Sequence, residues 1–205
     1  MNNRIILFGG TFDPIHNGHI KVAESAIKQL RGDVLVFIPA RRSPHKKEQP
    51  GADKSQRYEM IKLSIENHPE FEISDCEFYR NEPSYTLDTV LHFRKIFNNC
   101  AELFWLVGAD TVKDLCHWYK IEELVDECRL TIMRRGGVET PDFGEIEKTI
   151  GPERASKLKS DMIPTPLVDI SSTEIRRKIS NGENCSGLLP PKVADFITKN
   201  GIYSQ

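Results

Sequence analysis

The sequence predicts an α/β protein with an open, mostly parallel sheet and helices on both faces, a doubly wound arrangement. Three observations lead to this prediction. Short apolar runs alternate with amphipathic segments; the apolar runs are nearly continuous, as in strands that are buried on both faces; and loops with glycine or proline separate the two kinds of segment. The 205 residues are expected to form a single domain (1–205), whose C-terminal part, about 171–205, is helical.

The predicted strands are short runs rich in branched and aromatic side chains. They are 4–8 (RIILF), 34–39 (VLVFIP), 71–74 (FEIS), 103–108 (LFWLVG), 129–133 (RLTIM) and 167–170 (LVDI). The run at 103–108 is apolar throughout, which favours a central strand. The first two runs flank a helical segment, and this order predicts a right-handed βαβ unit with parallel strands.

Helices are predicted where apolar residues recur every three to four positions or where a cap is recognisable. They are about 19–31, the segment that follows Asp53, about 86–97, short helices within 110–128, then 171–179 and about 191–200. For the first helix, Asn17 is the expected N-cap and Gly32 the expected stop. The stretch 134–160 is rich in glycine and charge and predicts only a loop and an exposed helix.

Two later helices begin with residues spaced as capping boxes. Asp53 and Gln56 form one such pair, and Ser171 and Glu174 form the other. These signals set the expected starts of the two helices more firmly than apolar spacing does.

Composition argues against several classes of function. The net charge of −2 gives no support for nucleic-acid binding, and no segment approaches the ~18 apolar residues of a membrane span. The five cysteines are scattered without a CxxC pair, which predicts reduced thiols and a cytoplasmic protein; they are Cys76, Cys100, Cys116, Cys128 and Cys185. The expected partners are small molecules. The sequence is also compatible with a homo-oligomer and does not decide the oligomeric state.

The stretch GGTFDPIHNGH (9–19) joins the first predicted strand to the first predicted helix. Gly9 and Gly10 allow close approach to the backbone, and His16 and His19 share a face of the helix's first turn. Free N–H groups there favour an anion, so the stretch predicts a phosphate cradle. An ordinary turn and an H-x-x-H metal pair are the alternatives, although no third ligand stands at helical spacing.

A second anion site is predicted in ISSTEIRR (170–177). Ser172 and Thr173 offer hydroxyl and N–H groups at a helix start, and Arg176 follows one turn later. The alternative is an ordinary capped helix with a solvated basic face. The basic loop at 41–47 follows the second predicted strand and is either a phosphate clamp or a solvated loop.

Three more residues follow predicted strands or open helices near the same edge. The amide of Thr86 could bind a carboxylate at a helix start. Asp110, two residues after Gly108, is either an N-cap or a partner for a sugar hydroxyl. Trp118 either belongs to the core or stacks on a flat ring.

Together, GGTFDPIHNGH and ISSTEIR resemble the signature motifs of the nucleotidyltransferase superfamily. SPHK, PSYTLDT, GAD, the WY pair and the ending LLPPKVADFITKNGIY are similar to bacterial nicotinate-nucleotide adenylyltransferases, and the resemblance runs from residue 4 to residue 203. It implies a Rossmann-like nucleotidyltransferase fold. It also implies that ATP and nicotinate mononucleotide react to give nicotinate adenine dinucleotide and pyrophosphate, in NAD biosynthesis. Mg²⁺ would be carried by the ATP phosphates and not by a metal site of the protein.

The resemblance also implies roles for individual residues. The implied catalytic residues are His16, His19 and Lys46. The implied ATP-binding residues are Gly9, Gly10, Thr11, Phe12, His16, His19, Gly108, Ser172, Thr173 and Arg176. The implied substrate-binding residues are His45, Lys46, Thr86, Asp110, Trp118 and Arg134. The mononucleotide phosphate would attack the α-phosphorus of ATP directly, so that catalysis is mainly positioning and charge stabilisation.

Other functions remain alternatives at this point. Pantetheine-phosphate adenylyltransferases share the first motif, and a cytidylyltransferase is a more distant candidate. A module of the same fold could instead sense nucleotides without catalysis, and His16 with His19 could belong to a metal-dependent hydrolase.

Overall fold

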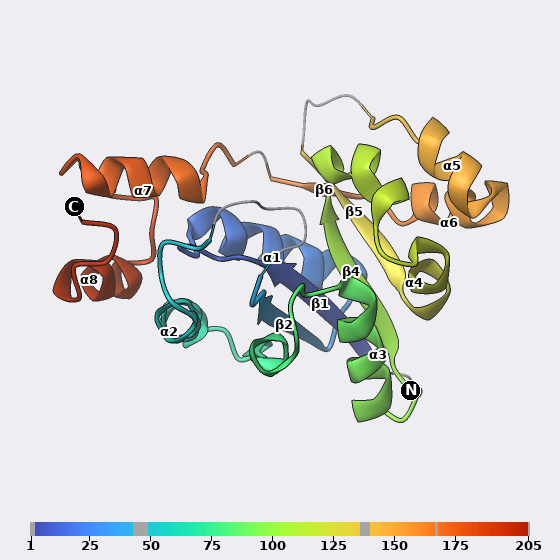
Figure 1. Cartoon of the computed structure of the whole chain (residues 1–205), viewed down its shortest axis with the longest axis horizontal. Helices are drawn as coiled ribbons and strands as arrows, with labels where there is room; N and C mark the ends of the chain where they lie inside the picture. The colour runs from blue at the N-terminus through green and yellow to red at the C-terminus, as the bar shows by residue number, and fades with distance from the viewer. Residues whose placement is uncertain (1–2, 43–48, 136–139, 167, 205) are drawn as a thin grey trace.

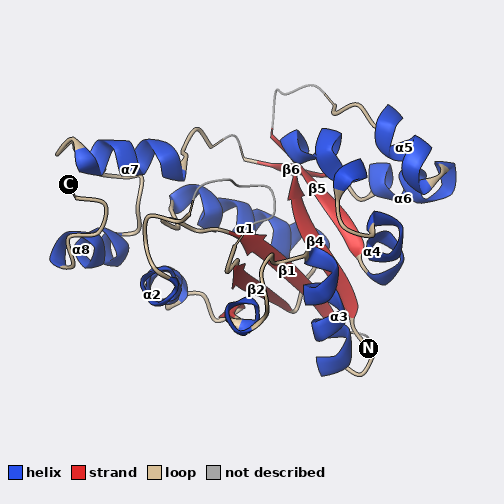
Figure 2. Cartoon of the chain, viewed as in Figure 1, coloured by secondary structure: helices blue, strands red, loops and turns tan. Residues whose placement is uncertain are grey.

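A parallel sheet forms the centre of the protein (Figure 2). The structure is a computed structural model that describes residues 3–42, 49–135, 140–166 and 168–204. Within these residues, six strands pair in the order β3–β2–β1–β4–β5–β6, and every pair is parallel. The strands are β1 (Arg4–Gly10), β2 (Val34–Pro39), β3 (Phe71–Ile73), β4 (Glu102–Gly108), β5 (Arg129–Arg135) and β6 (Ile163–Thr165). The prediction of an open parallel α/β sheet is confirmed.

The direction of the chain across the sheet reverses between β1 and β4. From β1 the chain continues to β2 and β3 on one side, and it then returns to place β4, β5 and β6 on the other side. The connections that leave β1 and β4 therefore diverge at the carboxyl ends of these two strands. In open α/β sheets such a point creates a crevice where ligands bind.

Helices cover both faces of the sheet (Figure 1). One face carries α1 (Asn17–Leu30), α2 (Lys54–Ile65), α7 (Ser172–Ser180) and α8 (Pro191–Lys199). The other face carries α3 (Thr86–Ile96), α4 (Ile121–Glu127), α5 (Gly144–Ile150) and α6 (Pro152–Ser160). Two short 3₁₀ helices, η1 (Cys76–Tyr79) and η2 (Ala109–His117), complete the connections.

The side chains of β1 alternate between the two hydrophobic cores on either face of the sheet. Ile5 and Leu7 pack in the cluster under α3 and α4, whereas Ile6 and Phe8 pack in the cluster under α1 and α2. Successive strand side chains point to opposite faces, so a strand covered on both sides must be apolar at every position. This requirement explains the uninterrupted run IILF.

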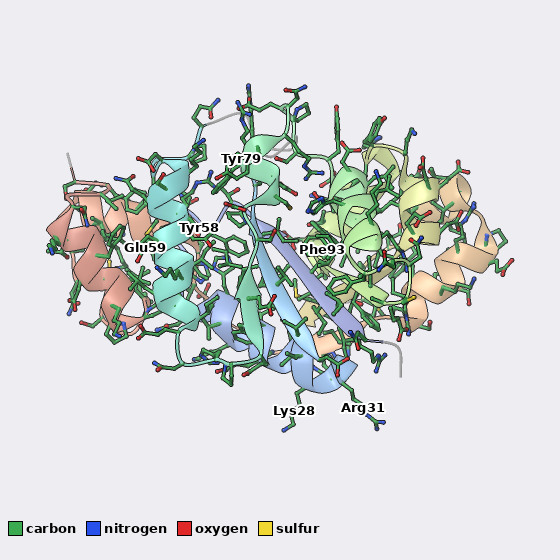
Figure 3. All side chains as sticks on the ribbon, turned by 90° about the horizontal axis from the view of Figure 1, so that it is seen from below. Lys28, Arg31, Tyr58, Glu59, Tyr79 and Phe93 are labelled. Atoms are coloured by element: carbon green, nitrogen blue, oxygen red, sulfur yellow. The ribbon has the colours of Figure 1, made fainter. Side chains whose placement is uncertain are left out.

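Helix α1 begins two residues earlier than predicted, and His16, not Asn17, is its N-cap. The Asn17 side chain is turned outward and donates to the carbonyl of Gly187 at 2.8 Å. At the other end, Arg31 adopts a left-handed conformation and the amide of Gly32 donates to the carbonyl of Ile27 at 2.9 Å. In Figure 3, Lys28 and Arg31 point away from the protein at this end.

The region after β5 differs most from the prediction. It contains two helices, α5 and α6, with buried apolar residues, and not a loop with one exposed helix. The sixth strand is β6 and not 167–170; the described residues 168–170 form no strand, and residue 167 lies outside the described residues. Among the described strands, β6 pairs with β5 alone, and an edge strand can accommodate Pro164, which lacks an amide donor.

The described chain contains no helix that is long and apolar enough to cross a membrane.

The close packing of Gly9 gives a first test. A Cβ on Gly9 would lie 2.4 Å from Cζ2 of Trp105, a buried side chain of β4. We expect Gly9→Ala to lower the free energy of unfolding by about 1–3 kcal/mol, because the indole must move in a packed core. Urea denaturation measures this change.

Gly144→Ala is the matched control. Its Cβ would meet only the end of the Asp142 side chain, at 3.2 Å, so we expect a change within about 0.5 kcal/mol. Equal effects of the two substitutions would contradict the packing argument.

Candidate active site

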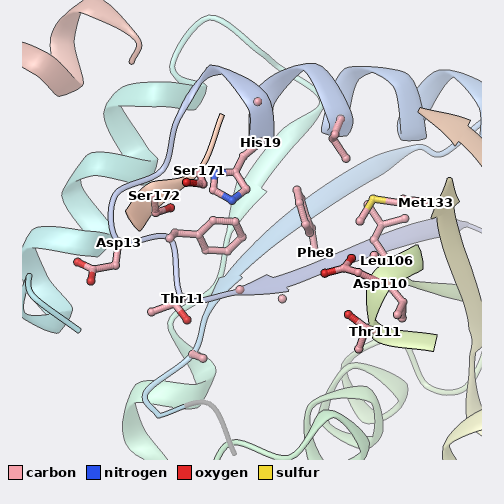
Figure 4. Close-up of a pocket in the computed structure, with 18 of the residues that line it drawn as sticks. Phe8, Thr11, Asp13, His19, Leu106, Asp110, Thr111, Met133, Ser171 and Ser172 are labelled. Atoms are coloured by element: carbon pink, nitrogen blue, oxygen red, sulfur yellow. The ribbon is translucent and has the colours of Figure 1, made fainter. Parts of the chain in front are cut away.

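A cleft of about 1300 Å³ opens at the carboxyl ends of the central strands (Figure 4). It collects residues from segments that are far apart in the sequence. Of the residues implied by the resemblance, those that line it are Gly9, Gly10, Thr11, Phe12, His16, His19, Thr86, Gly108, Asp110, Trp118, Ser172, Thr173 and Arg176. In Figure 4, His19 lies near Ser171 and Ser172, while Asp110 and Thr111 lie across the cleft.

Three implied site residues are not placed in this cleft. His45 and Lys46 lie outside the described residues. Arg134, in β5, is not among the described residues that line the cleft; its carbonyl accepts a hydrogen bond from Thr165 Oγ1 at 3.3 Å. The roles of these three residues stay predictions.

His16 and His19 form a stacked pair at the start of α1. Their ring centroids are 3.7 Å apart with an interplanar angle of 24°, and the amide of His16 donates to His19 Nδ1 at 3.2 Å. Phe12 and Phe8 also lie in edge-type arrangements with the His19 ring, with ring centroids 5.1 and 6.1 Å apart. The orientation of His19 is therefore set before any ligand binds.

His16 is buried, and its burial lowers its pKa to about 4. It is therefore a neutral imidazole at pH 7. Its Nδ1 has no hydrogen-bond partner among the described residues. A Cβ on Gly18 would lie 2.9 Å from this nitrogen and 2.9 Å from Cγ1 of Val168, so a glycine between the histidines leaves room for the His16 ring.

The glycine pair that follows β1 also makes room for rings. Gly9 faces Trp105, as described above, and a Cβ on Gly10 would lie 2.9 Å from Cζ of Phe12. The sequence predicts that something approaches the backbone closely at Gly9 and Gly10. In the structure, the groups that do so are the side chains of Trp105 and Phe12. Both rings are among the residues that line the cleft.

The N-terminus of α7 is docked on the loop that precedes α1. Ser171 caps the helix by accepting from the amide of Glu174 at 3.2 Å. Ser172 Oγ donates to the carbonyl of Pro14 at 2.9 Å, and Arg176 donates to the carbonyl of Asp13 at 2.8 Å. The first turns of α1 and α7 consequently face one cleft, and free N–H groups and helix dipoles at such ends favour phosphate.

A different part of the cleft carries Thr86 and Trp118. Thr86 is the first residue of α3, and Tyr85, its N-cap, stacks on Tyr119 with ring centroids 4.4 Å apart. Trp118 is half-buried, packs against the core beneath α3 and α4, and also lines the cleft. Trp118 can therefore belong to the core, as one prediction had it, and still present its ring to a ligand, as the other had it.

The sequence-based reasoning missed two buried charges beneath this site. Asp13 is 4% exposed and Arg57 is 2% exposed. Arg57 donates to the carbonyls of Thr11 and Ala40, both at 2.8 Å, and so joins the ends of β1 and β2. A signal existed in the sequence, because Arg57 stands four residues before the apolar Ile61 and therefore shares a helix face with it.

No cluster of three or more His, Cys, Asp or Glu side chains that could hold a metal ion occurs in the described part of the chain. The metal interpretation of H-x-x-H thus gains no third ligand from these residues.

Comparison with known proteins assigns the family. The Cytidylyltransferase-like family model matches residues 7–178. A Clostridium tetani protein named probable nicotinate-nucleotide adenylyltransferase is 40% identical over 199 residues, which cover 96% of this chain and 97% of that protein. The chain belongs to the nicotinate-nucleotide adenylyltransferase family. A relative of the same name from Caldicellulosiruptor bescii is 36% identical and covers 98% of this chain and 100% of that protein.

Solved structures agree with this family assignment at the level of the fold. A Plasmodium falciparum nicotinic acid mononucleotide adenylyltransferase complexed with NaAD aligns with a TM-score of 0.74 at 20% identity, over 98% of each chain. A putative nicotinate-nucleotide adenylyltransferase from Vibrio parahaemolyticus gives 0.68 at 20% identity, over 99% of this chain and 96% of that one. The family and the Rossmann-like nucleotidyltransferase fold inferred from the motifs are confirmed.

The neutral state of His16 generates a prediction about stability. Its pKa of about 4 in the folded protein lies below the ordinary histidine pKa of 6.5, so the unfolded chain takes up the proton more readily. The contribution of His16 is complete above pH 6.5 and is lost as the pH falls towards 4. For the ligand-free protein we expect a loss of about 3 kcal/mol of unfolding free energy over this window.

Denaturation curves at several pH values measure this dependence. His16→Gln, which cannot titrate, should flatten the curve between pH 6.5 and 4. An unchanged slope in that variant would show that other groups cause the acid sensitivity.

Proposed function

We propose that this enzyme joins ATP and nicotinate mononucleotide to give nicotinate adenine dinucleotide and pyrophosphate, by direct in-line attack. One observation carries the proposal. The first turns of α1 and α7 face the same cleft, with His16, His19 and Arg176, while Thr86 and Trp118 line another part of it. One part suits a triphosphate and the other suits a flat ring that bears a carboxylate.

The reaction needs positioning more than covalent chemistry. A phosphate oxygen of the mononucleotide forms a bond to the α-phosphorus of ATP, and the bond from that phosphorus to the β-phosphate oxygen breaks. The electron pair leaves with pyrophosphate. His19, whose ring is held by His16 and Phe12, donates to the oxygens on which charge develops, and Arg176 with Ser172 and Thr173 binds the β- and γ-phosphates.

The acceptor is held at the start of α3. The amide of Thr86 binds the nicotinate carboxylate, and Trp118 stacks on the pyridine ring. Asp110, an exposed carboxylate in the cleft, binds a ribose hydroxyl. As the family resemblance implies, Lys46 neutralises phosphate charge with His45 beside it, and Arg134 lines the site after its strand.

ATP enters as its Mg²⁺ complex. When bound, Mg²⁺ would neutralise part of the phosphate charge, while N–H, imidazole and guanidinium groups of the protein bind the phosphate oxygens. We also propose a cytoplasmic location, with which the five free cysteines agree, and small molecules as the partners of the active site.

Acceptor specificity provides the direct test. Pyrophosphate release from ATP and Mg²⁺ is measured with nicotinate mononucleotide, nicotinamide mononucleotide and phosphopantetheine, each offered separately. We expect strong turnover with the first, because only its carboxylate matches the helix start at Thr86. Comparable turnover with the first two would remove the carboxylate contact from the proposal. Turnover with phosphopantetheine alone, or with none, would overturn the function.

His19→Ala tests the histidine that faces the phosphates. We expect kcat to fall by about 10²- to 10³-fold, since one donor to the developing charge is lost. ATP binding, measured by calorimetry, should weaken much less than kcat falls. A variant that keeps its turnover would point to a nucleotide-sensing protein and away from this mechanism.

A further inference from the structure

Asp13 joins three parts of the chain that are distant in sequence. Its carboxylate is nearly inaccessible to solvent and accepts from the amide of Gly51 at 2.8 Å and from that of Ala52 at 2.9 Å. These two residues lead into α2. In Figure 4 the Asp13 side chain points away from His19. Asp13 is among the residues that line the cleft, but its side chain is turned away from His19, and its loop leads through His16 into α1.

The C-terminal end of the chain supplies the next partner. Tyr203 donates its hydroxyl hydrogen to Asp13 Oδ1 at 2.7 Å. Burial raises the pKa of Tyr203, and the hydrogen bond to Asp13 raises it further. The phenol consequently stays protonated and remains a donor at neutral pH. A buried carboxylate needs such donors, because an unpaired charge in the interior is strongly unfavourable.

Arg176 is the third partner, and it is the one that lines the cleft. Its Nη1 lies 3.6 Å from Asp13 Oδ2 and donates to the Asp13 carbonyl at 2.8 Å. Its Nη2 lies 3.5 Å from Thr173 Oγ1. A guanidinium has five N–H donors in a fixed plane, so anchoring Nη1 orients the remaining donors. Arg176 is thereby ordered without a ligand, which lowers the entropy lost on binding.

Arg57 is a second cation that Asp13 influences. Burial lowers the pKa of Arg57, and the negative charge of Asp13 is the largest opposing influence, ahead of those of Tyr203, Asp53 and Glu77. Asp13 therefore acts on Arg57 through its charge and pairs directly with Arg176 at 3.6 Å. Both guanidinium groups help to compensate the carboxylate in the interior.

We propose that Asp13, with Tyr203 as its hydrogen-bond donor, is a positioning residue for adenylyl transfer: it holds Arg176 in the orientation that binds the triphosphate. The inference rests on the proposed role of Arg176 in phosphate binding. It assigns a function in catalysis to a tyrosine near the C-terminus that contacts no reacting atom.

The test removes one hydroxyl group. Tyr203→Phe keeps the ring and deletes only the donor to Asp13. We expect the KM for ATP to rise about three- to tenfold, the value of one hydrogen bond, with the KM for nicotinate mononucleotide within twofold of wild type. Tyr58→Phe is the matched control, because the Tyr58 hydroxyl has no hydrogen bond within the described residues and does not line the cleft. We expect it to leave both KM values unchanged.

A double-mutant cycle separates positioning from general stability. In an Arg176→Ala background, Tyr203→Phe should change the KM for ATP by less than about twofold, because the oriented group is gone. Asp13→Asn is a second variant, and we expect it to raise the KM for ATP more than Tyr203→Phe does. Thermal unfolding of every variant confirms that the measured protein is folded.

Several results would overturn the inference. They are equal changes in both KM values, a full effect of Tyr203→Phe in the Arg176→Ala background, or a Tyr203→Phe enzyme that behaves like Tyr58→Phe. An Arg176→Ala enzyme with an unchanged KM for ATP would remove the phosphate role of Arg176 and this inference with it. Wild-type protein without turnover would instead overturn the proposed function, so the two failures are distinguishable.

Discussion

The reversal of chain direction between β1 and β4 is the constraint on which the site depends. Because β1 pairs with β2 on one side and β4 on the other, the connections that leave these strands diverge and a crevice opens between them. The loop after β1 and the first turn of α1 supply the two histidines, and the residues after β4 supply Asp110 and Trp118. The carboxyl edge of the sheet thus gathers groups that the sequence separates by about a hundred positions.

Packing at this edge is dominated by rings and not by flexible polar chains. Trp105 packs against Gly9, Phe12 packs against Gly10, and the imidazole rings of His16 and His19 stack on each other. Rings lose little conformational freedom when they are buried, because they have few rotatable bonds. A site made this way is ordered before substrate arrives, and preorganisation is what phosphoryl-type transfer chiefly requires of a protein.

Two of the buried charges of the described residues, Asp13 and Arg57, lie beneath the cleft, and both have hydrogen-bond partners there. Asp13 accepts hydrogen bonds from two backbone amides and a phenol, and Arg57 donates to two carbonyls at the ends of β1 and β2. Removing one member of such a network leaves another charge uncompensated, which is far more unfavourable than the loss of an exposed ion pair. The network therefore couples the C-terminus to the histidine loop.

The family, the parallel sheet and five of the six described strands are predictable from the sequence, because buried parallel strands leave continuous apolar runs and phosphate sites leave short motifs at strand ends. The sequence did not determine the region after β5, where the edge strand β6 is too short to leave a pattern. Nor did it reveal the partnership of Asp13 with Tyr203 and Arg176. Those contacts join positions up to 190 residues apart, and no local spacing encodes them. Tertiary structure alone decided which charges are buried and what each one holds in place.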